Sequence, residues 1–303
     1  MSVWATIGAT YGVISLGLGV VVWIAVGRML EKVDRLPDNT PVAFLQRLHG
    51  EIPTDEPDRR DSEESDKTVV VCVGDSITHG AISSNYVDLV AARLDPDTYE
   101  VINAGVNSDL AYNVTRRLDE IIECGPKVVT VLIGTNDANA LSNRANLRRY
   151  MRQKQLPQHP DAGWYRDNLT RIVGQLRKCT DARVALLSIP PIGEDPDHPA
   201  FVRSQEYGEI AKEIAAEEGA DYIPLGEALV SYMREHPGTP KLGQSHRVRL
   251  VAAAVFRNFV LKRSYAQISQ SNGYTLLIDH LHLNDTAASI VAEMVEEYVR
   301  SGQ

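Results

Sequence analysis

The sequence predicts an α/β domain whose parallel sheet is covered by helices on both faces. Short apolar runs rich in β-branched residues recur along the chain, and stretches with helical spacing of apolar residues separate them. These runs lack the alternation of polar and apolar residues that a half-exposed strand shows, as is typical of strands buried on both faces. Strands that alternate with helices of about 10–15 residues form βαβ units, and therefore a parallel sheet.

The expected strands are the short apolar runs. The first, TVVVCV, ends at Gly74, and VVTVLI is the strongest strand pattern in the chain. The fourth run stops at Pro190 and Pro191, which cannot continue a central strand. In chain order, strands are expected at residues 68–73, 99–103, 128–133, 184–189 and 221–224.

The expected helices fill the intervals between these strands. Apolar residues recur there every three or four positions, which gathers them on one face of a helix. Helices of this kind are expected at residues 86–94, 110–123, 163–178, 206–218 and 286–300, with a further short one at 41–49.

The composition excludes several classes of protein. The chain has 303 residues, 44% hydrophobic and 23% charged, which excludes collagen-like, coiled-coil and fully disordered chains. The net charge of -9 argues against a nucleic-acid partner, because such binders present a positive field. Three cysteines without a C-x-x-C pair supply neither a complete disulfide framework nor a cysteine-based zinc site.

Residues 1–27 form an expected single-pass transmembrane anchor. They contain no Asp, Glu, Lys or Arg, and residues 7–27 are long enough as a helix to cross a hydrocarbon core of roughly 30 Å. Arg28, Lys32 and Arg35 follow this span, so the positive-inside rule predicts that the rest of the chain lies in the cytoplasm. The extracytoplasmic orientation stays open as the alternative, because three charges give only a small bias.

A linker at residues 28–66 separates the anchor from the domain. Its second part, residues 51–66, holds eight acidic residues, two arginines and two prolines and no aromatic residue. That composition is typical of a disordered, solvated segment, and it accounts for -6 of the net charge. The folded domain is therefore expected at residues 67–303.

Polar motifs follow three of the expected strands. GDSITHG at 74–80 follows the first strand, Gly105 follows the second, and GTND at 134–137 follows the third. The carboxyl ends of parallel strands share one edge of the sheet, where ligands bind in folds of this class. The sequence therefore brings a hydroxyl, a glycine N–H and a carboxamide to the edge where a site belongs.

These groups are the ones that acyl transfer requires. Ser76 is the candidate nucleophile because it lies at the turn after a strand, and His282 is its candidate base. Asp279 precedes His282 by three residues, so one turn of chain can hold its carboxylate against the imidazole. The backbone N–H groups of Ser76 and Gly105 and the side-chain amide of Asn136 are the candidate oxyanion donors.

Some of these residues also have a purely structural interpretation. Asp75 and Ser76 can cap the helix after the first strand, and Asn136 with Asp137 can cap the helix after the third. We therefore assign Asp75 and Asp137 supporting roles, in which they hold the loops around the catalytic residues.

At these motifs the sequence resembles the SGNH/GDSL hydrolase family. Ser76, Gly105, Asn136 and His282 occupy, in the family's order, the four positions that name the family, and the D-x-x-H pattern at 279–282 also matches. The resemblance covers residues 67–300. It implies a three-layer α/β/α sandwich with a flavodoxin-like parallel sheet, and hydrolysis of esters or thioesters by the serine without a metal or other cofactor.

Two further segments lie between the motifs. Residues 236–278 contain six Lys or Arg and no acid, and the apolar residues 248–261 within them predict a helix. We expect this helix to form a lid that rests on anionic lipid, with an extra core helix as the alternative. Residues 138–158 are polar and carry five cations. A solvated loop is expected there, and a border of the site that contacts a negatively charged or sugar-bearing substrate is the alternative.

Together these expectations describe a membrane-anchored serine esterase that acts on lipid-like or acylated amphiphilic substrates through an acyl-serine intermediate. The alternatives are a carbohydrate O-acetylesterase or an acyltransferase that uses the same serine. A catalytically silent lipid- or glycan-binding module is the non-enzyme alternative, but binding does not require a Ser-His-Asp set. A metal site is disfavoured although four residues have ligand-like spacing, namely Asp279, His280, His282 and Asp285.

Overall fold

The computed structural model describes residues 37–49, 67–241, 243 and 247–302. The predicted membrane anchor at 1–27 and the predicted acidic segment at 51–66 lie outside these residues. Among the helices in the described ranges, none has both the length and the apolar composition of a membrane span.

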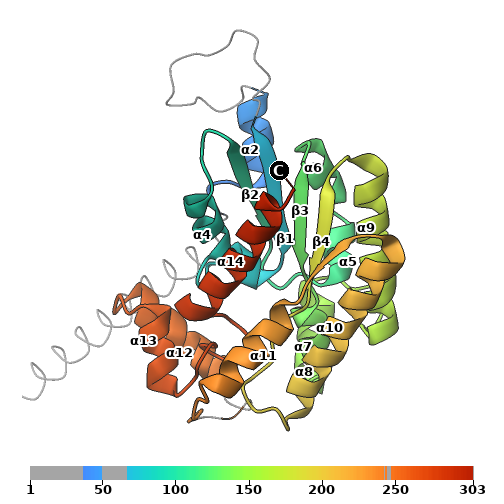
Figure 1. Cartoon of the computed structure of the whole chain (residues 1–303). Coiled ribbons are helices and arrows are strands. Elements are labelled where there is room, and N and C mark those ends of the chain that lie inside the picture. The colour runs from blue at the N-terminus through green and yellow to red at the C-terminus, as the bar shows by residue number, and fades with distance from the viewer. Residues whose placement is uncertain (1–36, 50–66, 242, 244–246, 303) are drawn as a thin grey trace, which may run out of the picture.

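A parallel five-stranded sheet forms the centre of the described fold (Figure 1). The strand order is β2-β1-β3-β4-β5, and every neighbouring pair is parallel. This is the flavodoxin-like order, so the predicted topology is confirmed. The strands are β1 (Thr68–Gly74), β2 (Tyr99–Gly105), β3 (Val128–Leu132), β4 (Arg183–Leu187) and β5 (Asp221–Ile223).

Helices cover the sheet on both faces, as predicted. One face packs against α4 (Tyr86–Arg93), α11 (Leu225–Glu235) and α14 (Asp285–Arg300). The other packs against α5 (Ala111–Thr115), α6 (Leu118–Glu123), α9 (Ala162–Cys179) and α10 (Pro199–Glu218). Side chains of β1 alternate between the two cores, with Val70 and Cys72 on one side and Val71 and Val73 on the other. This two-sided burial explains why the strand sequence shows no polar alternation.

The single helix expected at 110–123 is wrong, because the chain turns between α5 and α6. The turn residue Arg117 adopts φ -133° and ψ 24°, which is not helical. Its guanidinium donates to the carboxylate of Asp109 and to the carbonyl of Gly74. These tertiary bonds interrupt a pattern that has helical spacing in the sequence.

The solvated loop expected at 138–158 is also wrong. This part of the chain forms the end of α7 (Thr135–Ala140) and the ten-residue helix α8 (Arg144–Gln153). Asn143 caps α8, since its side chain accepts the backbone N–H of Asn146 at 2.8 Å. Most residues of the helix are polar, and Tyr150 is its one buried residue, so the sequence offered little apolar periodicity.

The helix expected at 248–261 is confirmed as α12 (Arg247–Phe259), and α13 (Tyr265–Asn272) follows it. The two helices pack together around Ala254, Tyr265 and Ile268. The hydroxyl of Tyr265 donates to the carbonyl of Ala81 at 2.9 Å, which ties the pair to the loop that follows α3 (Ser76–His79). Figure 1 shows α12 and α13 at the same end of the fold as α7 and α8.

The folded unit also includes residues before the expected boundary at 67. The helix α2 (Pro41–Leu48) packs Phe44 and Leu45 against one core. The carbonyl of Asn39 accepts the backbone N–H of Asn103 at 2.7 Å, along the edge strand β2. Part of the predicted linker therefore covers a sheet edge that would otherwise expose unpaired backbone groups.

Candidate active site

Ser76 lies at the carboxyl end of β1, as the first residue of α3. Asp75 caps this short helix, and its carboxylate Oδ1 accepts the backbone N–H of Ile77 at 2.9 Å. Gly80 ends the helix with φ 80°, in the left-handed region that glycine adopts at little cost. The cap confirms a structural task for Asp75, and it leaves the Ser76 N–H among the N–H groups without an intrahelical acceptor.

The three predicted catalytic side chains come together in hydrogen-bonding geometry. The Ser76 Oγ lies 3.0 Å from Nε2 of His282. The Nδ1 of His282 lies 2.6 Å from Oδ2 of Asp279. Asp279 is fully buried and His282 is 7% exposed, so water has little access to the carboxylate–imidazole pair.

The loop at residues 277–283 carries both Asp279 and His282. Leu277 and Leu283 form an antiparallel bridge at its base, and Ile278 donates its N–H to the carbonyl of His282 at 2.9 Å. Asp279 Oδ1 accepts the N–H groups of Leu281 and His282, which fixes the carboxylate within its own loop. The three-residue separation in the D-x-x-H pattern therefore lets one turn bring the Asp279 carboxylate to the His282 ring.

Further hydrogen bonds bring this loop to Ser76. Ser83, which follows α3, accepts the N–H of Leu283 at 2.9 Å, and the carbonyl of Leu283 accepts the N–H of Ser84 at 3.0 Å. Glu194 accepts three consecutive N–H groups at the start of the loop, those of Thr275, Leu276 and Leu277, at 2.7–2.9 Å. Burial raises the pKa of Glu194, against the effect of these donors.

The geometry of this trio supports nucleophilic catalysis. Asp279 orients the imidazole with its proton on Nδ1, which leaves Nε2 free to take the Ser76 proton during attack. The imidazolium that forms is stabilised by the buried carboxylate.

Gly105 is the last residue of β2, at the strand end where we expected it. Its N–H donates to Oδ1 of Asn103 at 2.9 Å, so its single donor is already used. A Cβ at this position would lie 2.2 Å from the backbone nitrogen of His79 and 2.6 Å from the carbonyl carbon of Thr78. This glycine therefore permits close contact between the end of β2 and α3, and its role as an oxyanion donor stays a prediction.

Asn136 lies beside Asp75, as predicted for a residue of the site. Its Nδ2 donates to Oδ2 of Asp75 at 3.1 Å and to the carbonyl of Asp109 at 3.0 Å. Its Oδ1 accepts the hydroxyl of Tyr150 at 2.6 Å. These three hydrogen bonds fix the orientation of the Asn136 amide. An oxyanion bound here would share an Nδ2–H group of Asn136 with Asp75 or with the carbonyl of Asp109.

Tyr150, a residue that the sequence did not single out, belongs to α8. Its hydroxyl also accepts Nδ2 of Asn139 at 2.9 Å. A buried tyrosine hydroxyl normally finds a partner, but the partner cannot be read from the sequence of a polar helix.

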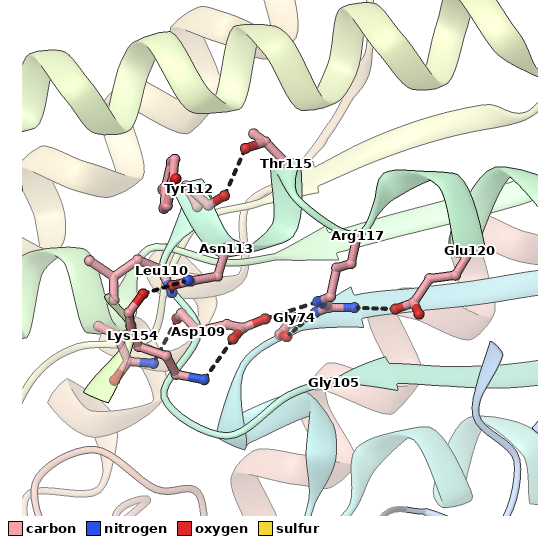
Figure 2. A network of polar contacts seen from close by, with 12 residues as sticks. Gly74, Gly105, Asp109, Leu110, Tyr112, Asn113, Thr115, Arg117, Glu120 and Lys154 are labelled. Atoms are coloured by element: carbon pink, nitrogen blue, oxygen red, sulfur yellow. Dashed lines mark hydrogen bonds and ion pairs between the residues drawn. The ribbon is translucent and has the colours of Figure 1, made fainter. Parts of the chain in front are cut away.

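Asp109 was also missed, and Figure 2 shows the network that surrounds it. Its carboxylate is paired with Nε of Arg117 at 2.9 Å and with Nζ of Lys154 at 2.8 Å. Arg117 also donates to the carbonyl of Gly74, the last residue of β1, at 3.1 Å. The network joins the end of β1 and the segment after β2 to Lys154, the residue after α8. Gly74 lies two residues before the catalytic serine.

The carboxyl groups of Asp75 and Asp137 are buried, and burial disfavours their charged forms. Burial raises the pKa of Asp75 to about 7 and the pKa of Asp137 to about 7. In each case a backbone donor partly opposes the shift; for Asp137 it is the N–H of Ala111, 3.1 Å from Oδ2. Asp137 thus holds the start of α5, as Asp75 caps α3, and their role in supporting catalysis stays a prediction.

The four residues with ligand-like spacing do not converge on one point. Asp279 pairs with His282, whereas the His280 ring lies 2.8 Å from the hydroxyl of Tyr274. Asp285 accepts the N–H of Ala266 at 2.8 Å. Within the described ranges, no group of three or more His, Cys, Asp or Glu side chains is arranged to hold a metal ion.

A cavity of about 380 Å³ lies beside the catalytic loop. It is bordered by the loop that begins at Gly193, whose N–H donates to the carbonyl of His280 at 2.9 Å. Its lining, here called the loop cavity, consists of Gly193, Glu194, Asp195, Pro196, His198, Pro240, Gly243 and His280.

Solved structures with a similar fold include two acetylxylan esterases. Axe2 from Geobacillus stearothermophilus matches with a TM-score of 0.55 and 17% identity, over 78% of this chain and 96% of that protein. The acetyl xylan esterase AlAXEase matches with a TM-score of 0.55 and 21% identity, over 76% of this chain and 99% of that protein. At such identities the likeness shows a shared fold. No curated protein sequence matches this chain.

The family model of the GDSL-like lipases and acylhydrolases matches residues 72–288. This range covers most of the chain, including Ser76, Asn136 and the loop with Asp279 and His282. The serine, imidazole and carboxylate found together in the structure are the groups that ester hydrolysis by this family requires. The chain therefore belongs to the GDSL-like lipase/acylhydrolase (SGNH) family and is a serine hydrolase of ester bonds.

Proposed function

We propose that this enzyme is a carbohydrate O-acetylesterase, which removes acetyl groups from the hydroxyls of a glycan. The observation that carries the proposal is the likeness of its fold to two acetylxylan esterases across 96% and 99% of their lengths. That likeness supports our alternative substrate, an acetylated carbohydrate, better than the lipid-like ester that we expected first.

The loop cavity is the candidate site for the sugar. Its lining includes the side chains of Asp195, His198 and His280, which offer charged and polar groups beside the catalytic loop. Such groups exchange hydrogen bonds with sugar hydroxyls, and the apolar part of the lining can contact the faces of a sugar ring. In this proposal the glycan lies in the loop cavity, beside the catalytic loop.

The reaction follows from the catalytic geometry. Ser76 Oγ attacks the acetyl carbonyl carbon while its proton moves to Nε2 of His282. The carbon–oxygen bond to the sugar breaks, and the leaving sugar oxygen takes the proton from His282. Water then attacks acetyl-Ser76 with His282 again as the base, which releases acetate and restores the serine. We expect the backbone N–H groups of Ser76 and Gly105 and the side-chain amide of Asn136 to stabilise the oxyanion in both steps.

The direct test measures acetate release from acetylated xylo-oligosaccharides by the wild-type chain and by Ser76→Ala. The wild type is expected to release acetate, and the serine variant is expected to lose at least about 10³-fold in kcat. A matched series of p-nitrophenyl esters from acetate to palmitate is expected to be cleaved with decreasing kcat/KM as the chain lengthens.

Faster cleavage of the palmitate than of the acetate ester, with no acetate released from the oligosaccharides, would reject the proposal. That result would return the lipid-like substrate to first place. If the protein is folded and its Ser76 reacts with a fluorophosphonate, but it hydrolyses neither the oligosaccharides nor the p-nitrophenyl esters, acyl transfer becomes the favoured activity.

We also propose that residues 1–27 anchor this enzyme in a membrane and that α12 rests on the membrane surface. Phe256, Val260 and Leu261, at and just after the end of α12, are 49%, 46% and 52% exposed. Arg257 follows Phe256 and Lys262 follows Leu261, and this combination suits an interface with anionic lipid. Co-sedimentation of residues 37–303 with phosphatidylglycerol vesicles tests this, and equal sedimentation of Phe256→Ser/Leu261→Ser would contradict it.

A further inference from the structure

The helix α8 has two faces with different tasks. Tyr150 points inward and donates its hydroxyl proton to Oδ1 of Asn136 at 2.6 Å. Arg144, Arg148 and Arg152 recur every fourth residue and are exposed, so they form a stripe along another face. The same helix therefore contacts the active site on one side and presents cations on another.

This cationic stripe borders a groove of about 430 Å³. Its floor is half-buried, because Leu147 and Met151 line it, and Met151 packs against the cluster around Tyr150. The volume lies in the range of roughly 300–1,000 Å³ that small-molecule sites occupy. We call it the arginine groove; it is lined by Arg144, Leu147, Arg148, Met151, Arg152 and His159.

Among the described residues, the arginines of this groove have no acidic partner. No Asp or Glu occurs between residues 138 and 160. Within the described part of the chain, Arg144, Arg148 and Arg152 form no ion pair, whereas the nearby Lys154 is paired with Asp109 at 2.8 Å. Three like charges at this spacing repel one another and weaken an isolated helix. An anionic ligand removes that repulsion.

We propose that the arginine groove binds the carboxylates of an acidic glycan, and that this glycan carries the acetyl ester cleaved at Ser76. Guanidinium groups bind carboxylates through two parallel hydrogen bonds, which gives this pairing geometric specificity. A uronic-acid residue supplies such a carboxylate on a ring that fits a groove of this size. The identity of the ester rests on the proposed deacetylation of glycans, but the binding of the acidic sugar does not.

The surroundings of the groove favour a glycan over a membrane or a nucleic acid. The large hydrophobic side chains that are exposed in the described structure lie elsewhere, so the groove has nothing to insert into a bilayer. The whole chain carries a net charge of -9, which opposes a long polyanion such as nucleic acid. A short oligosaccharide contacts the groove alone and avoids that repulsion.

The position of α8 connects binding with catalysis. α7 begins directly after β3, at the carboxyl edge of the sheet, and α8 follows it at that end of the fold (Figure 1). Ser76 occupies the same edge at the end of β1. A glycan that is held by its acidic sugar at α8 can therefore extend toward Ser76 along one edge of the sheet.

Calorimetry with tetragalacturonate tests the binding step on the full chain. The probes are tetragalacturonate, neutral xylotetraose and phosphatidylglycerol vesicles, each at two salt concentrations. The groove variant is Arg144→Gln/Arg148→Gln/Arg152→Gln, and its thermal midpoint checks that it folds. The matched control removes three exposed cations elsewhere, Arg116→Gln/Arg171→Gln/Lys178→Gln.

We expect the wild type and the control to bind tetragalacturonate equally, more weakly at high salt, and the groove variant to bind at least about tenfold more weakly. Equal binding by the groove variant, or no binding by the wild type, would overturn the proposal. Loss of vesicle binding with unchanged tetragalacturonate binding would assign the groove to a lipid headgroup instead. If acetylated oligosaccharides are not cleaved but tetragalacturonate binding depends on the groove, the proposed function fails and the acidic-glycan site stands.

Discussion

Tyr150 donates a hydrogen bond of 2.6 Å to the side-chain oxygen of Asn136, across 14 residues of sequence. The bond joins a polar surface helix to the side-chain amide that donates to Asp75, the residue before the catalytic serine. The Asn136 amide has two possible orientations, and only the one with Oδ1 toward Tyr150 turns its N–H groups toward Asp75 and Asp109. We infer that Tyr150 is a positioning residue.

Replacement of Tyr150 by phenylalanine is therefore expected to lower kcat by about tenfold while KM changes little. The ring keeps its packing, and only the hydroxyl that fixes the Asn136 amide is lost. Steady-state kinetics with p-nitrophenyl acetate measure the effect. Tyr112→Phe is the matched control, because Tyr112 stacks on Trp164 at 5.1 Å and lies outside the Asn136 network. Equal kcat values for the two variants would remove the positioning role.

The sequence predicted most of the sheet and the catalytic trio, for reasons that are local. Strands buried on both faces consist of long apolar runs, so β1 and β3 were found within a residue or two of their ends. The D-x-x-H pattern is read from a single turn, whose hydrogen bonds lie within residues 279–282. Ser76 follows the first strand directly, so its place at the sheet edge is a consequence of topology.

The parts that the sequence did not reveal depend on contacts between distant segments. Nothing in the sequence around Asp109 indicates that its carboxylate binds both Arg117 and Lys154. Gly105 matched a motif, yet its role depends on the distance to the backbone of α3. The helix α8 has a polar sequence, and its one buried anchor, Tyr150, finds a partner only in the folded chain.

Asp279→Asn is expected to lower kcat by about 10⁴-fold at neutral pH, as in other Ser-His-Asp sites. The asparagine keeps an oxygen to accept the N–H groups of Leu281 and His282, so the loop is preserved. Its amide cannot replace the carboxylate that holds the Nδ1 proton and stabilises the imidazolium. Asp285→Asn is the control in the same segment, and kinetics with p-nitrophenyl acetate compare them. Retention of a tenth of wild-type kcat by Asp279→Asn would contradict the assignment.

Arg117→Met is expected to reduce the free energy of unfolding by about 3 kcal/mol. The variant leaves the buried carboxylate of Asp109 with Lys154 alone and the carbonyl of Gly74 without its side-chain donor. Denaturant unfolding measures the change. Arg116→Met alters the preceding, exposed arginine and is expected to stay within about 0.5 kcal/mol of wild type. Similar losses in both variants would show that the Asp109 network contributes nothing specific.

Gly105→Ala is expected to destabilise the fold by at least about 2 kcal/mol. The added Cβ meets backbone atoms of α3 at 2.2 Å and 2.6 Å, and backbone cannot move aside as a flexible side chain can. Alanine keeps the N–H group, so lost stability points to packing rather than to a missing donor. Gly163→Ala is the control, since its nearest atom is 3.4 Å away and it lies in α9. An unchanged thermal midpoint for Gly105→Ala would contradict the packing role.

The buried carboxyl of Asp137 makes the stability of the fold depend on pH. Its pKa is raised by burial from 3.8 to about 7, so between these two values the native state holds a proton that the unfolded chain releases. The contribution of this group to the free energy of unfolding is therefore fully present below pH 4. It falls as the pH rises toward 7, by up to about 1.4 kcal/mol per pH unit.

Asp137→Asn is expected to flatten this dependence, because its amide oxygen can still accept the N–H of Ala111 but carries no charge at any pH. Free energies of unfolding from urea titrations at pH 5, 6, 7 and 8 give the slope for each protein. Asp181→Asn, which replaces an exposed carboxylate, is expected to keep the wild-type slope. Because Asp75 has a similarly raised pKa, part of the slope is expected to persist in Asp137→Asn. A slope that is identical in wild type and Asp137→Asn would show that Asp137 is ionised at little cost in the folded chain.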